Sequence, residues 1–278
     1  MIKERLKILR NKFKKYNIDG YIIPKNDEFF SEYSKVNRLK SISNFSGSAG
    51  YAIILKNKTF LFVDGRYTIQ AQNESANYYK IVDYNKIINC GLFKNCTIGF
   101  DPKLFTSNQL KKFFHKNNKI KSISSNLIDE IIKKKSFFSK PFFSLDKTIV
   151  GEDFRDKINK ISKYLKKEKL DHIFISAPEN VAWLLNIRGY DSPNSPIPNA
   201  HLMLSKNKKI YLISEKKKMK NLIKEKKINS NQIIELKNFS KFISGLKGKK
   251  ICMDPLTCSF LIEKILARKF KIFKKEDP

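Results

Sequence analysis

The sequence predicts an α/β protein built from two similar domains, each a mixed β-sheet flanked by helices. Two observations support this fold class. The same succession of helical and strand patterns occurs twice, with a period of about 150 residues. In addition, a Lys-Asn-Lys turn stands at the same place in both halves. Helices and strands that alternate in this way are typical of sheets covered by helices.

Each half begins with an amphipathic helix that leads into a buried strand. Apolar residues recur at helical spacing in the two helices, at Ile2, Leu6, Leu9 and Phe13, and at Phe154, Ile158, Ile161 and Leu165. A short polar turn follows each helix. The strands are then expected at residues 20–24 and 172–176, where apolar residues run together.

A β-hairpin follows in each half. The first pairs residues 51–55 with 59–63 across the turn Lys56-Asn57-Lys58. The second pairs residues 201–205 with 209–213 across the turn Lys206-Asn207-Lys208. Asn tolerates the left-handed conformation that such turns need, so both turns favour hairpins.

Each half closes with a strand that ends in Asp-Pro and a helix after it. The strands are expected at residues 97–101 and 250–254, and the helices at 106–117 and 258–269. Between the halves, residues 136–150 show no clear period and include Pro141. The predicted domains are therefore residues 1–140 and 141–278.

The formal net charge of the chain is +31, from 57 basic and 26 acidic residues. Such a charge suggests nucleic-acid binding as one hypothesis. However, only seven of the basic residues are Arg, the residue whose forked side chain suits phosphate recognition. The lysines are also spread along the whole chain. The composition therefore disfavours nucleic acid as the partner.

The sequence contains no apolar run near the roughly 20 residues that span a bilayer, and it shows no signal-peptide pattern at its start. Its four cysteines are few for this length, which fits a reducing compartment. We expect a cytoplasmic protein without a membrane partner.

Four segments, in this order and spacing, resemble the aminopeptidase P (X-prolyl aminopeptidase) family of the creatinase/prolidase superfamily. They are Tyr21-Ile22-Ile23-Pro24 with Ser31-Glu32-Tyr33; Ile42 through Gly50; Val63-Asp64-Gly65-Arg66-Tyr67 with Gln70-Ala71; and Ser176 through Gly189 with Asp191. The resemblance covers the whole chain and is closest to the long, three-domain cytosolic members.

The resemblance implies a metal-dependent Xaa-Pro aminopeptidase, a hydrolase that removes the N-terminal residue preceding proline. In this family, two domains of similar fold precede a "pita-bread" catalytic domain. That domain binds two Mn²⁺ ions through Asp, His and Glu side chains, and a metal pair can activate water for hydrolysis. Peptides with proline at the second position, and a second copy in a homodimer, are the partners that the resemblance implies.

The chain departs from the family in one respect. His115, His172 and His201 lie in the two front domains and match no ligand motif of the family. We therefore expect this chain to be a fragment without the C-terminal metal-binding catalytic domain, to hold no cofactor of its own and to be inactive alone.

Arg66 is the candidate substrate-binding residue, with Asp64 and Tyr67 in support. In the family, the Arg of this segment is carried toward the active site and contacts the peptide. An Arg just past a strand end can offer several donors to a carbonyl or carboxylate. From the residues alone, the alternative is that Asp64 and Arg66 only hold the end of the hairpin together.

Trp183 and Arg188 are two further supporting candidates in the second domain. Trp183 stands in a helical run with Val181, Leu184 and Leu185, which predicts packing in the core. Arg188 and Gly189 are expected to shape a loop that meets the catalytic domain. The Gly-rich stretch from Gly47 to Gly50 precedes a strand and no helix, which argues against a phosphate site and favours a close approach of backbones.

Two alternatives stay open beside a peptide-positioning or gating role in the aminopeptidase. One is a stand-alone interaction module or pseudoenzyme that pairs with a separately encoded catalytic domain. The other is a basic nucleic-acid binder, whose affinity would fall steeply with salt.

Overall fold

The computed structural model describes residues 1–31, 34, 36–114, 116–132 and 139–278. Internal contacts divide the chain into unit 1, Met1–Ser136, and unit 2, Phe137–Pro278. Three parts of the sequence interpretation fall outside the described residues: Glu32 and Tyr33 of the first resemblance segment, His115, and residues 136–138 of the predicted junction. The predicted boundary at 140/141 stays a prediction.

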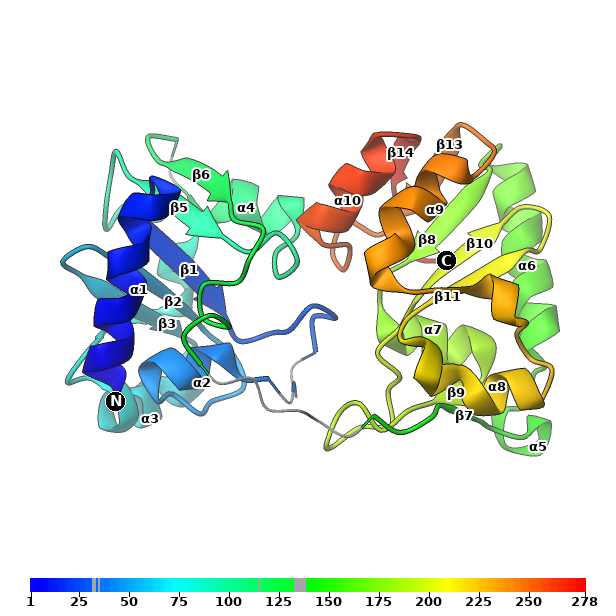
Figure 1. Cartoon of the computed structure of the whole chain (residues 1–278), viewed down its shortest axis with the longest axis horizontal. Coiled ribbons are helices and arrows are strands. Elements are labelled where there is room, and N and C mark those ends of the chain that lie inside the picture. Colours follow the sequence, from blue (N-terminus) through cyan, green and yellow to red (C-terminus); the bar gives the residue numbers. More distant parts are fainter. Residues whose placement is uncertain (32–33, 35, 115, 133–138) are drawn as a thin grey trace. The chain divides into compact units, whose positions relative to one another are not determined.

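Unit 1 is one six-stranded mixed sheet with helices against it (Figure 1). Its strand order is β4-β3-β2-β1-β5-β6. The elements are α1 (Ile2–Tyr16), β1 (Gly20–Pro24), α2 (Arg38–Ser43), β2 (Tyr51–Leu55), β3 (Thr59–Val63), α3 (Thr68–Ser75), β4 (Lys80–Asp83), β5 (Thr97–Phe100), α4 (Ser107–Phe113) and β6 (Lys119–Ser122).

The core of unit 1 forms where the apolar stripe of α1 meets one face of the sheet. Leu9 and Phe13 of α1 are almost fully buried, in one cluster with Ile23 and Ile54 of the sheet. α1 ends at Asn17, which takes the left-handed conformation with φ 48°. This conformation suits Asn and ends the helix where β1 must begin.

Unit 2 is a second six-stranded mixed sheet, with the order β12-β11-β10-β8-β13-β14. Its elements are β7 (Phe143–Ser144), α5 (Lys147–Val150), α6 (Phe154–Lys167), β8 (His172–Ile175), α7 (Pro178–Leu185), β9 (Ile187–Arg188), β10 (His201–Ser205), β11 (Ile210–Ile213), α8 (Lys220–Lys224), β12 (Ile233–Ile234), α9 (Phe239–Gly245), β13 (Lys250–Met253), α10 (Phe260–Ala267) and β14 (Lys271–Lys274). β7 and β9 form a separate two-stranded pair.

The sheet of unit 2 is buried on both faces. On one face, Ile173 and Leu202 pack in a cluster with Leu165 of α6. On the other, Phe174 and Met203 pack in a cluster with residues of α9 and α10. Successive residues of a strand point to opposite faces, so β8 and β10 contribute to both clusters.

The structure confirms the predicted fold class, and both predicted hairpins form. Tyr51 pairs with Phe62 in the first hairpin, and His201 pairs with Ile213 in the second. Four strands at the outer edges of the sheets were missing from the sequence interpretation: β4, β6, β12 and β14. The predicted closing helices are also shorter than expected, as α4 and α10 show.

Candidate functional site

The segment that follows β3 carries the candidate residues of unit 1. After Val63 the chain turns through a short 3₁₀ helix, Gly65–Tyr67, and continues into α3. The Asp64 carboxylate accepts a hydrogen bond of 2.9 Å from the backbone N–H of Arg66 and so caps this turn. A side chain that satisfies a free N–H at a helix start holds the local backbone in place.

Arg66 lies on the surface and is clamped by Asp64. Its Nη2 donates to Asp64 Oδ2 at 2.6 Å, and its Nε lies 3.1 Å from each carboxylate oxygen. The guanidinium also lies 5.4 Å from the centroid of the Tyr67 ring. The hydrogen bonds from Arg66 hold the pKa of the Asp64 carboxyl below its usual range. The Arg66 side chain is 73% exposed.

Tyr67 joins this segment to the Gly-rich segment of the second resemblance motif. Its hydroxyl lies 2.8 Å from Ser48 Oγ, and its ring packs edge-on against Phe45 at 5.9 Å. Gly47 and Gly50 make the approach feasible. A Cβ at Gly47 would come within 2.2 Å of the Phe45 ring, and one at Gly50 within 2.9 Å of the Phe62 carbonyl oxygen.

A polar network completes the contact between the two segments. Glu74 accepts from the backbone N–H and from the hydroxyl of Ser46, both at 2.7 Å. Gln70 Nε2 donates to Ser46 Oγ at 2.8 Å. The structure therefore brings two of the four resemblance segments together around Arg66. Ser46 and Gln70 stand within the resemblance segments, but the sequence did not indicate this network, because Ser46 is 24 residues from Gln70 and 28 residues from Glu74.

Trp183 corrects the sequence interpretation, because it is 55% exposed and does not pack in the core. In α7, Val181 and Leu185 are buried. At 3.6 residues per turn, Trp183 lies about 200° around the helix from Val181, on the opposite face. A continuous apolar run cannot bury every residue of one short helix against one surface. Its indole instead lies over the Lys157 ammonium, 4.1 Å from the ring centroid.

The end of α7 is surrounded by cations. Lys157 Nζ donates to the Trp183 carbonyl at 2.9 Å and to Asn186 Oδ1 at 2.7 Å. Lys227 Nζ donates to the Leu185 carbonyl at 3.1 Å, and Arg188 Nη1 to the Ala182 carbonyl at 3.3 Å. Cations favour the carbonyl end of a helix. Arg188 therefore has a structural contact here, and its predicted role toward another domain stays a prediction.

The histidines of unit 2 are buried and make hydrogen bonds within their own unit. His172 lies 2.8 Å from Ser205 Oγ and 2.6 Å from the Lys247 carbonyl oxygen through its two ring nitrogens. His201 Nδ1 lies 2.8 Å from the Ser176 carbonyl oxygen, and burial lowers the pKa of His201 to about 4. Within the described ranges, no three His, Cys, Asp or Glu residues come together as a metal site.

In the part of the chain that the structure describes, no helix is both long and apolar enough to span a bilayer.

Comparison with known proteins agrees with the two-unit fold. The family model described as "Creatinase/Prolidase N-terminal domain" matches residues 5–131, and a second model of the same description matches residues 133–278. Among solved structures, the chain is similar to an X-prolyl aminopeptidase from Caenorhabditis elegans, described as a cytosolic enzyme with a di-nuclear active site. The TM-score is 0.85 at 24% identity, over 99% of this chain and 50% of that one.

Curated relatives show the same similarity in sequence. A probable Xaa-Pro aminopeptidase P from Laccaria bicolor is 31% identical over 76% of this chain and 35% of its own length. Xaa-Pro aminopeptidase 2 from Rattus norvegicus is 31% identical over 72% of this chain and 32% of its own length. The chain thus spans about a third of these relatives. It belongs to the creatinase/prolidase N-terminal domain family, and it contains two such domains in succession.

Proposed function

We propose that this chain is the N-terminal, non-catalytic part of a metal-dependent Xaa-Pro aminopeptidase, in which it positions or gates the peptide substrate. The observation that carries the proposal is the pair of family domains along the chain, together with the sequence similarity to relatives named as Xaa-Pro aminopeptidases. The bond cleaved would be the peptide bond before proline, and its hydrolysis would take place on a catalytic domain with a manganese pair.

In this proposal, Arg66 is the direct contact with the peptide. Its side chain is exposed, yet Asp64 and the aromatic ring of Tyr67 restrict its position. A pre-positioned guanidinium loses less freedom when it donates to a peptide carbonyl or carboxylate than a freely moving one would. Ser48 Oγ lies 2.8 Å from the hydroxyl of Tyr67, and Glu74 accepts from the Ser46 N–H, so the segment that carries Arg66 is joined to the Gly-rich segment.

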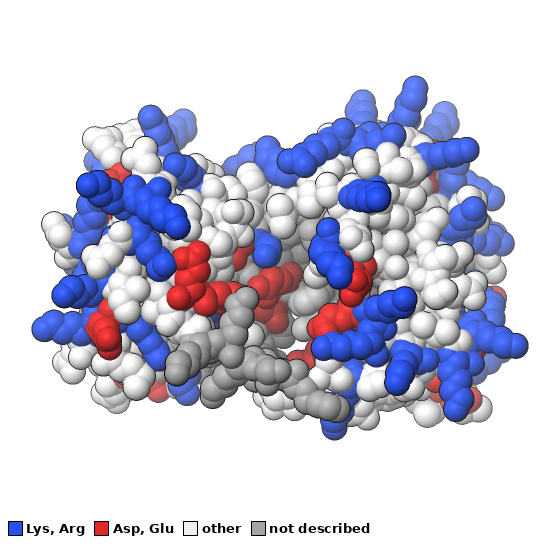
Figure 2. Space-filling view, viewed as in Figure 1, with Lys and Arg blue, Asp and Glu red and all other residues white. Residues whose placement is uncertain are grey.

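The scattered positions of the lysines argue against a nucleic-acid interface. Figure 2 shows basic side chains distributed over the visible face of each unit. An interface for nucleic acid usually gathers Lys and Arg on one face or stripe. We therefore keep nucleic-acid binding as an outcome to be tested at low salt.

The experiment compares the purified 278-residue protein with the same protein mixed with a catalytic domain of the family. Release of N-terminal residues from Xaa-Pro peptides is followed with Mn²⁺ present. The proposal expects no release by the chain alone, and activity of the catalytic domain on longer peptides that rises when this chain is added. Hydrolysis by the chain alone, or a catalytic domain indifferent to it, would contradict the proposal.

A further inference from the structure

The four outer strands of the two sheets differ in how they are protected. Three of them carry charged residues along a short sequence: β4 reads Lys-Ile-Val-Asp, β6 reads Lys-Ile-Lys-Ser and β14 reads Lys-Ile-Phe-Lys. Charged side chains on an edge strand discourage pairing with another chain. The edge strand β12 of unit 2 has only Ile233 and Ile234 and therefore lacks this protection.

The backbone of β12 offers hydrogen-bonding groups to the outside. The Ile234 carbonyl accepts from the Ser214 N–H at 3.1 Å, so the polar groups of Ile234 face β11. Backbone groups of successive residues in a strand alternate in direction. The carbonyl of Ile233 and the N–H of Glu235 therefore face away from β11, at an edge where no strand of the described chain pairs.

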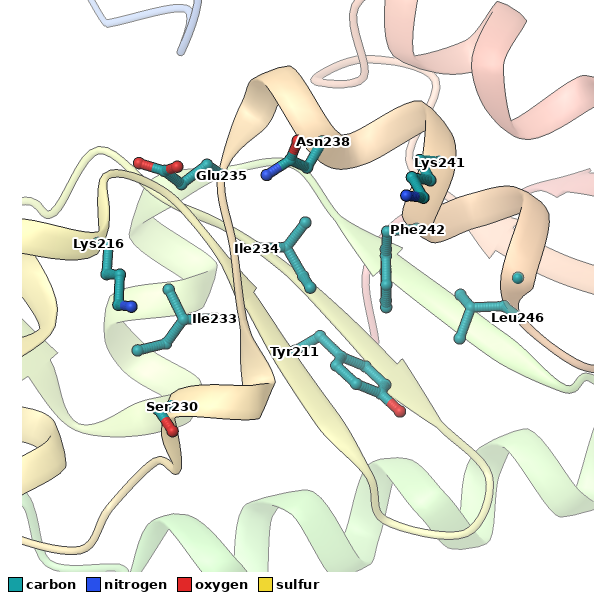
Figure 3. Close-up of a pocket in the computed structure, with 11 residues that line it drawn as sticks. Tyr211, Lys216, Ser230, Ile233, Ile234, Glu235, Asn238, Lys241, Phe242 and Leu246 are labelled. Atoms are coloured by element: carbon teal, nitrogen blue, oxygen red, sulfur yellow. The ribbon is translucent and has the colours of Figure 1, made fainter.

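A groove of about 720 Å³ follows this edge. Its apolar surface comes from both sides of the sheet, because Ile233 packs with one core cluster of unit 2 and Ile234 with the other. In Figure 3, Ile233 points toward Lys216 on one side of β12, and Ile234 points toward Phe242 on the other. The lining residues are Tyr211, Lys216, Ser230, Ile233, Ile234, Glu235, Asn238, Lys241, Phe242, Gly245 and Leu246.

This shape suits an extended polypeptide better than a compact ligand. A strand places successive side chains on opposite faces of a sheet. A strand added beside β12 would therefore set one side chain next to Ile233 and the next one beside Ile234 and Phe242. Addition of a strand to an exposed sheet edge is a recurring mode of peptide recognition.

The charged residues at the groove indicate which charge an added strand should carry. Lys216 and Lys241 flank the groove, both exposed, and neither forms an ion pair within the described residues. Glu235, the acidic residue of the lining, already pairs with Lys237 at 2.9 Å. Two copies of this edge would bring lysines against lysines on chains of net charge +31, which opposes self-pairing.

We propose that the β12 edge of unit 2 binds an extended acidic polypeptide segment as a seventh strand of the sheet. The Ile233 carbonyl and the Glu235 N–H form the backbone hydrogen bonds. Tyr211, Ile234 and Phe242 receive apolar side chains on one face, and Lys216 and Lys241 pair with carboxylates. This site is separate in sequence and in unit from Arg66, so it does not depend on the proposed aminopeptidase role.

The test uses the full 278-residue chain and a blocked nonapeptide with three glutamates on each side of a central Val-Val-Val, so that carboxylates reach both faces of the added strand. Binding is measured by titration calorimetry, and hydrogen exchange is measured at the Glu235 amide. We expect that amide to exchange at least tenfold more slowly with peptide bound. Lys216→Glu combined with Lys241→Glu should weaken binding about tenfold or more, from the loss of two ion pairs and their replacement by repulsion. The matched control is Lys3→Glu with Lys7→Glu on exposed positions of α1, which changes the net charge equally.

Five outcomes would overturn the proposal. Equal weakening by the two double variants would show attraction to the overall charge alone. Equal binding of a fully N-methylated peptide, or an unchanged Glu235 amide, would show that no strand forms. Equal binding of a peptide with lysine in place of glutamate would remove the acidic requirement. A dimer that Ile233→Lys converts to monomer would assign the edge to a second copy of the chain.

Discussion

Unit 1 and unit 2 share one strand order but diverge directly after the third strand of each sheet. In unit 1, Arg66 stands three residues after the end of β3, clamped by Asp64. In unit 2, Lys216 stands three residues after the end of β11, beside the groove at the β12 edge. The repeated framework thus supports a different surface at the same position, because function resides in loops and edges attached to a fold.

The two units also differ in where cations bind the first helix between strands. In unit 1 the cation lies at the start of that helix, and in unit 2 the cations lie at its end. In unit 1, α2 begins at Arg38, a buried cation that bonds acidic side chains. In unit 2, α7 ends among Lys157, Lys227 and Arg188, which bond its last carbonyls. The chain has one tryptophan, Trp183, so its fluorescence reports on unit 2, whereas far-ultraviolet circular dichroism reports on both units.

The largest expected effect is the loss of Arg38. Its Nε and Nη2 bond the Asp129 carboxylate at 2.7 and 2.9 Å, and Nη2 also bonds Glu28 at 2.6 Å, while Arg38 is only 4% exposed. Removing one partner of a buried ion pair leaves the others uncompensated, so Arg38→Met should cost unit 1 about 3 kcal/mol. Urea unfolding should show an earlier dichroism transition and an unchanged fluorescence transition.

Arg155→Met is the control for this prediction, since the Arg155 side chain is 70% exposed and lies 3.9 Å from Asp153. It should leave both transitions in place. If Arg38→Met lowers the urea midpoint of fluorescence as well as that of dichroism, the two units unfold together. The two signals would then not compare unit 1 with unit 2.

Acid should weaken unit 2 through its histidines. Burial lowers the pKa of His201 to about 4, from an ordinary value near 6.5, and also lowers the pKa of His172. Between these values the unfolded chain binds the proton and the folded chain does not, so stability is present above pH 6.5 and is lost as pH falls toward 4. For His201 alone, about 2.5 pKa units correspond to about 3 kcal/mol.

The measurement for this prediction is the urea midpoint of Trp183 fluorescence at pH 7 and at pH 4.5. We expect a lower midpoint at pH 4.5 and a much smaller difference in His201→Gln. The same midpoint at both pH values in the unsubstituted chain would contradict it.

Lys157→Met should have a smaller effect, confined to unit 2. The substitution leaves the Trp183 carbonyl and Asn186 Oδ1 without their donor, a loss of about 1–2 kcal/mol. Because burial already lowers the pKa of Lys157, relief from that desolvation offsets part of the loss. The fluorescence midpoint and the emission of Trp183, which loses the cation over its ring, should both change. A loss of stability in Lys157→Met as large as that in Arg38→Met would contradict the prediction that Lys157 contributes less.

The periodicity of the sequence predicted the central parts of both sheets well. Strands such as Tyr51–Leu55 and His201–Ser205 are buried throughout, because both faces are covered, and their turns contain Asn. The edge strands were not predicted, and the reason is physical. Strands such as Lys119–Ser122 are exposed at every residue, and Ile233–Ile234 has only two residues, so neither shows a buried pattern.

The site was predictable only where the chain itself brings residues together. Asp64 and Arg66 are two residues apart, and their clamp follows from that spacing. The groove at β12 joins Tyr211 with Phe242 and Lys216 with Ile233, residues that the sequence separates and that only the folded sheet edge assembles. Trp183 was placed wrongly because a continuous apolar run does not say which face of a helix is covered.

The most direct test of the proposed function is the effect of Arg66→Ala on kcat/KM for Xaa-Pro peptides, in an active enzyme assembled from this chain and a catalytic domain of the family. Arg155→Ala is the matched control, because Arg155 is an exposed arginine of unit 2 that lies next to Asp153. A charged hydrogen bond to the peptide predicts a loss of about 10- to 100-fold for Arg66→Ala, partial rescue by Arg66→Lys, and unchanged kcat/KM for Arg155→Ala. Full activity of Arg66→Ala, or an equal loss in both variants, would contradict the assignment of peptide contact to unit 1.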